Sequence, residues 1–449
     1  MNSDCRYEGV TMKEKLKTII RKLTWTYNPA TEREASDSTA RNFLLHWFPA
    51  KVTKKSMSFS YSMLLGTIIL TLFLILTMTG LILMFLYVPS VGKAYWSIKD
   101  LQFVVPYGWF IRDLHRVAAQ LMVAVVFIHL VRVFLTGAYK HSEKIVGSYR
   151  PLNWWIGLAL LLVTMLLSYT GYLLPWDQLA LWAITIGDHI ALSAPVVGSA
   201  ISRVLIGGTI IDQNTLIRWY VAHVFFLPVI ISLLILWHMW RIRKDGGLAV
   251  VEALGIERIK EDKVVAKAKT YSLMGIVTGI TPTITQYRVR GEAVSSSPNL
   301  TRRVLVVMVL VTAVSMGLAF FYKAPLEQPA SLMWTPNPAK APWYFLWLQE
   351  LVADTTIRLG GLTISGGFVG GIVIPTVLLL FAAAWPLIDR SPEEAIGVWF
   401  HKSRNLQNAA FILVCTVIVA LIYVGAVMRG PYWHLYMPWQ HWIKMPTRF

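Results

Sequence analysis

The sequence predicts an all-α integral membrane protein with seven transmembrane helices, in which a four-helix bundle precedes three further helices. The 449 residues are 55% hydrophobic and only 15% charged, and their mean hydropathy is +0.54. Seven long stretches lack Asp, Glu, Lys and Arg, and each can cross about 30 Å of hydrocarbon. Two of them carry paired histidines at nearly equal spacing. Because a backbone in lipid must satisfy its own hydrogen bonds, each stretch should be helical.

The expected spans also divide the chain into domains. The second span contains the charge-free stretch 117–131 and extends from Leu114 to Val133. We expect the spans at 59–87, 114–133, 152–174, 219–240, 304–322, 364–386 and 408–428. A polar, basic segment separates the fourth span from the fifth. The predicted domains are a cytoplasmic extension at 1–55, a four-helix domain at 56–241, a cytoplasmic linker at 242–302 and a three-helix domain at 303–449.

The formal net charge of +18 is interpreted as a signal of membrane topology. Basic clusters precede the first span, follow the second and follow the fourth, where the positive-inside rule puts cytoplasmic segments. The loops after the first, third and fifth spans then face the positive side of the membrane. The 19 Trp are typical of a membrane-interface belt. The expected contact is therefore lipid, and no nucleic acid is expected to bind.

Four histidines point to a pair of metal sites inside the bundle. His115 and His129 are 14 residues apart in the second span, and His223 and His238 are 15 apart in the fourth. On an α-helix these spacings give about 21–22 Å of rise with the two imidazoles on roughly one face. Ionisable groups inside a membrane are costly and usually functional. Two facing helices of this kind predict a four-helix di-haem bundle with two non-covalent, bis-histidine haems b.

Glycines in the first and third spans repeat with the same period as the histidines. Gly66 and Gly80 are 14 apart, as are Gly157 and Gly171. A missing side chain lets another surface approach a membrane helix closely. The matching period favours haem edges passing over these glycines, although ordinary packing of small residues is the alternative.

Three arginines near the span ends are candidates for binding haem propionates. Arg116 follows the first histidine, Arg132 lies three residues after the second, and Arg218 precedes the third by five. A guanidinium can pair with a carboxylate in two parallel hydrogen bonds. The alternative is that these side chains extend to the membrane interface.

Only Cys5 and Cys415 occur in the chain. They cannot supply a disulfide framework, a CxxCH haem attachment or a cysteine cluster for iron–sulfur. An iron–sulfur centre or a haem c, if one takes part, must therefore belong to a partner protein.

With these residues in place, the chain resembles cytochrome b of the Rieske/cytochrome b complexes between about residues 35 and 430. The resemblance is strongest in HRVAAQLM…IHLVRVFLTGAYK, in SYTGYLLPWDQLALWA and in TLIRWYVAHVFFLPVI…WHMWRIRKDGG. The 15-residue histidine spacing and the three-helix second half resemble the chloroplast-type branch, whose two halves are here fused in one chain. The resemblance implies that His115 pairs with His223 and that His129 pairs with His238.

The resemblance also implies an activity. Such a chain oxidises membrane quinol at the positive side, and one electron goes to a Rieske iron–sulfur protein and then to a c-type cytochrome. The other electron crosses the two haems to a quinone site at the negative side, near Arg243, Lys244 and Asp245. The oxidation site would be built by two loops: Tyr172, Pro175, Trp176, Asp177 and Gln178, and Ala341, Pro342, Trp343 and Tyr344. A dimer of complexes in a prokaryotic cytoplasmic or internal energy-transducing membrane is expected.

Two positions depart from the family pattern. The family usually has Pro-Glu-Trp-Tyr, whose glutamate accepts a quinol proton, whereas this chain reads KAPWYF with Pro342 in the glutamate's place. We expect Glu350 to replace it, with Asp177 as the alternative and Asp354 further away. Menaquinone is the expected quinone because the glutamate is missing. Leu64 stands where the chloroplast branch attaches a third haem through cysteine, so no covalent haem is expected.

A second class of function must be weighed against quinol oxidation. A haem-binding membrane anchor for another redox module would also need the four histidines. It would not need the PWDQ and PWY loops together, and this combination favours the quinol oxidoreductase.

Overall fold

The structure is a computed structural model that describes residues 11–13, 16, 51–142, 149–245, 247–248, 257–258, 287–288 and 293–441. Most of the predicted extension at 1–55 and most of the predicted linker at 242–302 lie outside the described residues.

The described residues confirm an all-α protein with seven helices long and apolar enough to cross a membrane. Most of each helix lies within an expected span. They are α4 (Leu65–Leu86), α6 (Gly108–Leu135), α7 (Arg150–Leu173), α10 to α11 (Gln213–Lys244), α14 (Ser296–Phe321), α16 to α17 (Gly366–Ile388) and α18 with its flanking turns (Lys402–Met428). α10 is Gln213–Val221, α11 is Leu227–Lys244, α16 is Gly366–Phe368, α17 is Ile374–Ile388 and α18 is Asn405–Tyr423.

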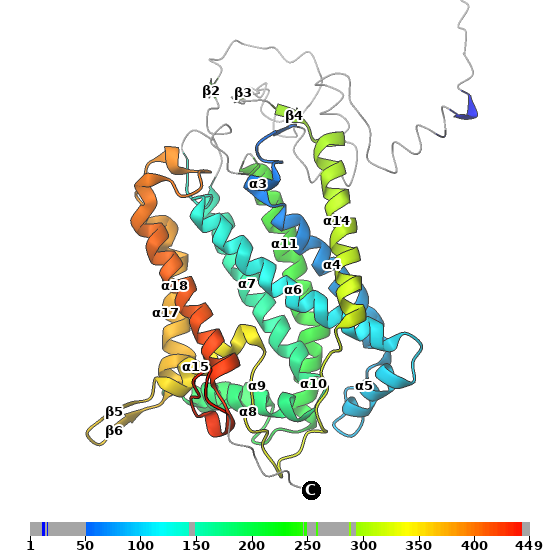
Figure 1. Ribbon diagram of the computed structural model, residues 1–449, viewed down its shortest axis with the longest axis vertical. Coiled ribbons are helices and arrows are strands. Elements are labelled where there is room, and N and C mark those ends of the chain that lie inside the picture. Colours follow the sequence, from blue (N-terminus) through cyan, green and yellow to red (C-terminus); the bar gives the residue numbers. More distant parts are fainter. Residues whose placement is uncertain are drawn as a thin grey trace, which may run out of the picture.

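Helices α4, α6, α7 and α11 form the predicted bundle (Figure 1). Its centre is apolar, where Leu72, Ala118, Met122 and Ile231 are buried together. α14 packs on α4 and α6, while α17 packs on α7. The indole nitrogens of Trp154 and Trp155 donate to carbonyls of α17 at 2.8 and 2.7 Å. The three later helices therefore flank the bundle on two sides.

Short elements gather at the two ends of the bundle. We call the end where α4 begins and α11 ends the linker end, and the opposite end the loop end. The loop end carries α5 (Ala94–Phe103), α8 (Gln178–Leu192), α9 (Gly198–Ile206), α15 (Trp343–Asp354) and the hairpin of β5 (Ile357–Leu359) and β6 (Leu362–Ile364) (Figure 1). The linker end carries α3 (Phe59–Ser62) and the antiparallel pair of β1 (Lys51–Thr53) and β4 (Ala293–Ser295). A two-residue pair, β2 (Glu257–Arg258) and β3 (Tyr287–Arg288), is also antiparallel. Single 3₁₀ turns occur at Glu393–Ala395, Lys402–Arg404 and Pro431–Trp433.

Several helices begin before or after the expected start of their span, and two of these differences have a clear local cause. The first span was expected from residue 59, but the chain breaks at Met63 and Leu64, whose φ angles are 47° and 49°. The fourth span was expected from residue 219, but its helix begins at Gln213, where Asp212 and Thr215 form a capping box. A cap of this kind satisfies the first backbone N–H groups and extends the helix beyond its apolar stretch.

Three π-helical turns occur in the later spans, two inside a span and one at the end of the last span. They are Ala222–Phe226, Val369–Val373 and Val424–Met428. Proline follows the first two, at Pro228 and Pro375, and a residue without an N–H disturbs the regular hydrogen-bond ladder. The first of these turns contains His223, and π-turns often occur at functional sites.

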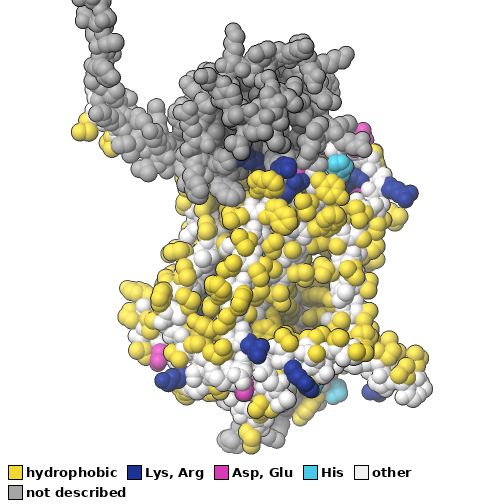
Figure 2. Space-filling view, turned by 180° about the vertical axis from the view of Figure 1, so that it is seen from behind, with side chains coloured by type: hydrophobic (Ala, Val, Ile, Leu, Met, Phe, Trp, Pro, Cys, Tyr) yellow, Lys and Arg dark blue, Asp and Glu magenta, His cyan; other side chains and the backbone are white. Residues whose placement is uncertain are grey.

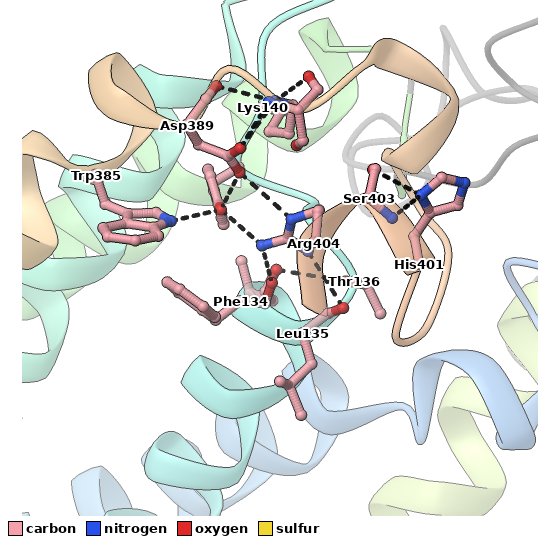
Figure 3. A network of polar contacts seen from close by, with 12 residues as sticks. Phe134, Leu135, Thr136, Lys140, Trp385, Asp389, His401, Ser403 and Arg404 are labelled. Atoms are coloured by element: carbon pink, nitrogen blue, oxygen red, sulfur yellow. Dashed lines mark hydrogen bonds and ion pairs between the residues drawn. The ribbon is translucent and has the colours of Figure 1, made fainter. Parts of the chain in front are cut away.

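A buried polar network connects the second half of the chain to the end of α6 (Figure 3). Arg404 is fully buried, and its guanidinium donates to the Phe134 carbonyl at 2.9 Å and to the Tyr139 hydroxyl at 2.7 Å. The Tyr139 hydroxyl in turn donates to Asp389 at 2.6 Å. Asp389 also pairs with Lys140 at 3.4 Å and with Arg404 at 3.3 Å. Two cations and one carboxylate thus share one desolvated site at the linker end.

The surface supports the membrane assignment. Hydrophobic side chains form a broad band over the helices, and Lys and Arg lie near its two ends (Figure 2). Large exposed side chains on the spanning helices include Phe226, Leu233, Leu310, Leu380 and Leu413. Such continuous apolar exposure matches contact with lipid, so the chain is a multi-pass membrane protein.

Candidate di-haem and quinol site

The four histidines meet in two pairs at two depths of the bundle. The ring centroids of His115 and His223 are 6.4 Å apart, and those of His129 and His238 are 6.5 Å apart. One metal between two imidazole nitrogens, with bonds of about 2.0–2.1 Å and a ring offset of about 1.1 Å at each end, needs about 6.4 Å. Both separations therefore fit one iron between each pair. The pairing is the one that the sequence resemblance implied.

Threonine hydroxyls orient the pair nearer the loop end. Thr79 Oγ1 lies 2.8 Å from His115 Nδ1 and donates its own proton to the Ile75 carbonyl at 2.7 Å. Thr170 Oγ1 lies 3.0 Å from His223 Nδ1. With its proton committed to the carbonyl, the Thr79 hydroxyl accepts from Nδ1–H of His115. The Nε2 lone pair of that ring is then available for a metal, as outer-shell hydrogen bonds usually arrange for histidine ligands.

Three of the four predicted glycines lie against these imidazoles. A Cβ added to Gly171 would come 2.6 Å from His223 Cε1, and one on Gly80 would come 3.3 Å from His115 Cε1. Gly157 would place a Cβ 3.7 Å from His238 Cε1, whereas Gly66 would meet nothing within 4 Å. The glycines of α7 at both depths and Gly80 of α4 therefore leave room for the imidazoles, whereas the passage of haem edges over them stays a prediction.

The contact between Gly171 and His223 leaves no room for a side chain at position 171. We expect Gly171→Ala to displace His223 and to lower the amount of the haem nearer the loop end, because an imidazole cannot tolerate a carbon atom at 2.6 Å. Gly317→Ala on α14, where an added Cβ meets nothing within 4 Å, is the matched control. Optical difference spectra of the two purified variants measure the effect. An unchanged spectrum in Gly171→Ala would show that this contact does not limit the site.

The pair nearer the linker end borders a cavity of about 100 Å³. Among the described residues, several buried polar atoms at its wall have no hydrogen-bond partner: Nδ1 of His129 and His238, Nε of Arg132 and Arg150, the second terminal nitrogen of Arg132, Oδ1 of Asn153 and Oδ2 of Asp245. Buried polar groups without partners are rare in proteins. Two guanidinium groups beside a histidine pair suit a haem with its two propionates.

The arginine predictions have mixed outcomes. Arg132 is buried at this cavity and stacks on Tyr61 at 4.8 Å, which supports a role at a propionate. Arg116 lies over the ring of Tyr172 at 5.4 Å and has a buried, unpaired Nε. Arg218 is exposed and donates to the Val204 carbonyl of α9. That contact does not support a propionate role for Arg218.

A second and larger cavity, of about 390 Å³, opens at the loop end. Its walls come from α7, α8, the end of α9, α10, and α15 with the segment that leads into it. Of the residues predicted for quinol oxidation, Tyr172, Ala341 and Pro342 line it. Its volume and largely apolar lining are typical of a site for a drug-sized ligand. Pro342 is the N-cap residue of α15, so the segment after it is helical, as expected from a proline at a helix start.

Asp177 and Gln178 bind the backbone of the loop after α14 instead of lining the cavity. The Gln178 amide donates to the carbonyls of Ser331 and Trp334 at 2.8 and 2.6 Å. Asp177 accepts from the backbone N–H of Ala180 and of Glu327 at 2.9 and 3.1 Å. Burial raises the pKa of Asp177, and these two N–H bonds partly oppose the shift. The lining of the cavity omits Pro175, Trp176, Asp177, Trp343 and Tyr344.

The comparisons with known proteins agree with this geometry. The family model described as Cytochrome b/b6/petB matches residues 50–246. The cytochrome b6 of Mastigocladus laminosus is 42% identical over 182 residues, which are 40% of this chain and 81% of that protein. The cytochrome b6 of Synechococcus elongatus is 41% identical over the same shares. The chain belongs to the cytochrome b/b6 family.

A solved structure extends the likeness to the three-helix half. A chain titled "Hyperthermophilic respiratory Complex III" superposes with a TM-score of 0.62 at 24% identity, covering 84% of this chain and 86% of that chain. At this identity the match shows a shared fold. It covers more of the chain than the family model, whose match ends at residue 246.

The expected replacement for the family's glutamate is not placed at the cavity. Glu350 is fully buried, but its carboxylate is held by Arg429, with Nε at 3.0 Å and a terminal nitrogen at 2.8 Å from Oε2. That terminal nitrogen also binds Asp354 at 2.6 Å. Glu350 is absent from the residues that line the cavity. Its paired carboxylate therefore joins α15 to the segment after α18, and the prediction of a proton acceptor at this position is not supported.

At the linker end, the predicted quinone-site residues differ in their surroundings. Asp245 is buried, lines the smaller cavity, and accepts from Arg241 at 2.6 Å through Oδ1. Lys244 lies over the ring of Trp240 at 5.0 Å. Arg243 belongs to the last turn of α11. Of the three, Asp245 is placed best to exchange a proton with a ligand.

Sequence reasoning missed two buried arginines. Arg150 donates to the Asp245 carbonyl at 2.9 Å and lines the smaller cavity. Arg112 donates to the carbonyls of Ala324 and Pro325 at 2.8 and 2.6 Å and fixes the loop after α14 on α6. Both lie at helix ends in sequence, where basic residues normally indicate only membrane topology.

Proposed function

We propose that this chain is the di-haem cytochrome b subunit of a quinol:cytochrome c oxidoreductase, a multi-subunit, proton-translocating enzyme. The observation that carries the proposal is the combination of two histidine pairs, at 6.4 and 6.5 Å, with a cavity of about 390 Å³ at the loop end. A haem-binding anchor without quinol oxidation would need the histidine pairs and not this cavity.

The two histidine pairs would each hold one haem b without a covalent bond. His115 and His223 would hold the iron nearer the loop end, and His129 and His238 would hold the one nearer the linker end. The bound haems supply reversible one-electron chemistry. Thr79 and Thr170 orient the first pair, while Arg132 and Arg150 at the smaller cavity would neutralise haem propionates.

The larger cavity would bind the quinol. Tyr169, Tyr172 and Pro342 border it, and apolar walls exclude water from the reacting hydroxyl groups. Asp177 and Gln178 keep the loop after α14 closed over α8 through backbone hydrogen bonds. Menaquinone remains the expected quinone because Pro342 replaces the family's glutamate.

The remaining features of the proposal concern partners and location. Quinol oxidation delivers its first electron to an iron–sulfur protein of the Rieske type and then to a c-type cytochrome. The described part of the chain offers Cys415 as its only cysteine, so these centres would belong to other subunits. A quinone would be reduced at the linker end near Arg243, Lys244 and Asp245. A dimer of complexes in a prokaryotic or internal energy-transducing membrane completes the assignment.

The direct test is quinol-dependent reduction of cytochrome c by the complex purified from its native membrane. With menadiol as donor under anaerobic conditions, we expect turnover that depends on the enzyme and on intact haems. The matched control is the His115→Leu complex, which should reduce cytochrome c no faster than buffer. A wild-type complex that contains both haems, an iron–sulfur protein and a c-type cytochrome, yet fails to turn over with menadiol and with a ubiquinol analogue, would contradict the proposal.

A further inference from the structure

The larger cavity needs a proton acceptor that the family motif does not supply. Oxidation of a quinol to a quinone releases two protons and two electrons, and Pro342 has no side-chain group that accepts a proton. Glu350 is committed to Arg429, and both carboxylate oxygens of Asp177 accept backbone N–H groups. None of these residues offers an open carboxylate to a ligand in the cavity.

Asp188 is different from those carboxylates in position and in its contacts. It lies near the end of α8 and lines the larger cavity together with Pro342. Its Oδ1 is buried and, among the described residues, has no hydrogen-bond partner. A buried carboxylate oxygen without a donor is costly, so a ligand hydroxyl that reached this oxygen would be bound favourably. The next residue, His189, is exposed, so Asp188 lies close to the surface of α8 in sequence.

Asp188 is the sole carboxylate among the residues that line the cavity. The other titratable groups there are Tyr169 and Tyr172 of α7 and Lys340 before α15. The Tyr169 hydroxyl donates to the Ala183 carbonyl at 3.0 Å. The same hydroxyl lies against Gly187, because a Cβ added to this glycine would clash with it. Lys340 donates to the Ala426 carbonyl at 2.8 Å. The walls from α9 and α10 are Leu205, Ile206 and Trp219, which carry no charge.

We propose that Asp188 is a catalytic residue that accepts a proton from the bound quinol, in place of the carboxylate that Pro342 removes. This inference rests on the proposed function. In the step, a quinol O–H bond breaks, its proton forms an O–H bond with the Asp188 carboxylate, and the second proton leaves with the iron–sulfur partner. The two electrons leave to two one-electron acceptors, that partner and the haem pair of this chain.

The test compares Asp188→Asn with the wild-type complex, using menadiol and cytochrome c. General-base catalysis contributes on the order of 100-fold or more, so kcat should fall at least tenfold while KM for menadiol changes little. A carboxylate accepts a proton only when ionised, so wild-type turnover should decline toward acid pH. This acid limb should disappear in Asp188→Asn and return in Asp188→Glu. Asp100→Asn on α5, an exposed carboxylate at the same end, is the matched control and should behave as wild type.

The outcomes separate the inference from the function on which it rests. Wild-type turnover with an unchanged kcat and pH profile in Asp188→Asn would overturn the role of Asp188 and leave the proposed function intact. No turnover in the intact wild-type complex would overturn both. If Asp188→Asn does not assemble, Asp188→Thr, which is similar in volume, takes its place. Haem spectra of each variant confirm that the site itself is preserved.

Discussion

His115→Leu and His223→Leu are each expected to remove the same haem, the one nearer the loop end, and to abolish quinol-dependent turnover. Their rings face each other at 6.4 Å, and leucine has no nitrogen to complete the coordination of iron. His129→Leu and His238→Leu should remove the other haem for the same reason. Reduced-minus-oxidised spectra of the four purified variants should fall into two groups, each lacking one spectral component.

The control for this series is His434→Leu, an exposed histidine outside the spans, which should keep both components. Loss of one component in His115→Leu and of the other in His223→Leu would contradict the pairing. Loss of both haems in a variant that still assembles would show that the two sites depend on each other in a way the structure does not explain.

Asp389→Ala is expected to give the largest loss of stability among substitutions outside the haem pairs. It leaves Arg404 and Lys140 buried without their carboxylate and removes the acceptor of the Tyr139 hydroxyl. Breaking a buried ion pair in this way typically costs about 3–5 kcal/mol. The thermal midpoint of the detergent-solubilised complex should fall clearly. Glu394→Ala, on the same loop but exposed, is the control and should change the midpoint little.

The lowered pKa of the Asp389 carboxylate makes the stability of the fold depend on pH. Burial alone would raise the pKa of Asp389, but hydrogen bonds from Tyr139 and Ser391 and the nearby Lys140 lower it to about 2. An unfolded aspartate has a pKa of about 3.9. A lowered native pKa stabilises the fold above the unfolded value, and this contribution is lost as pH falls from about 4 to about 2. Wild type should lose stability in this range more steeply than Asp389→Ala, and parallel curves would argue against the network.

Apolar length predicted the seven spans, histidine spacing predicted the bundle with two histidine sites, and the family resemblance implied which histidines pair. These features depend on local periodicity, which is fixed by helix geometry. The boundary at Gln213 was missed because Asp212 extends the helix through a polar cap. The π-turn around His223 was missed as well, since it depends on how the helix accommodates Pro228.

The candidate quinol site was less predictable, because its residues meet through contacts between distant segments. Glu350 was chosen from its distance along one helix, and its partner Arg429 lies 79 residues further on. Asp188 carries no motif, and only the packing of α8 against the segment before α15 brings it to the same cavity as Pro342. The PWDQ residues lie at the loop end of the bundle, together with the PWY segment, as the resemblance implied. Asp177 and Gln178, however, bind backbone groups there instead of lining the cavity.

The central claim is that this chain holds two haems b between two pairs of histidines. Pyridine haemochrome analysis of the purified chain, after extraction with acidic acetone, tests it most directly. The account predicts two extractable haems b per chain and no haem left on the protein band in a denaturing gel. One haem or none per chain, or a haem that stays on the protein, would contradict it.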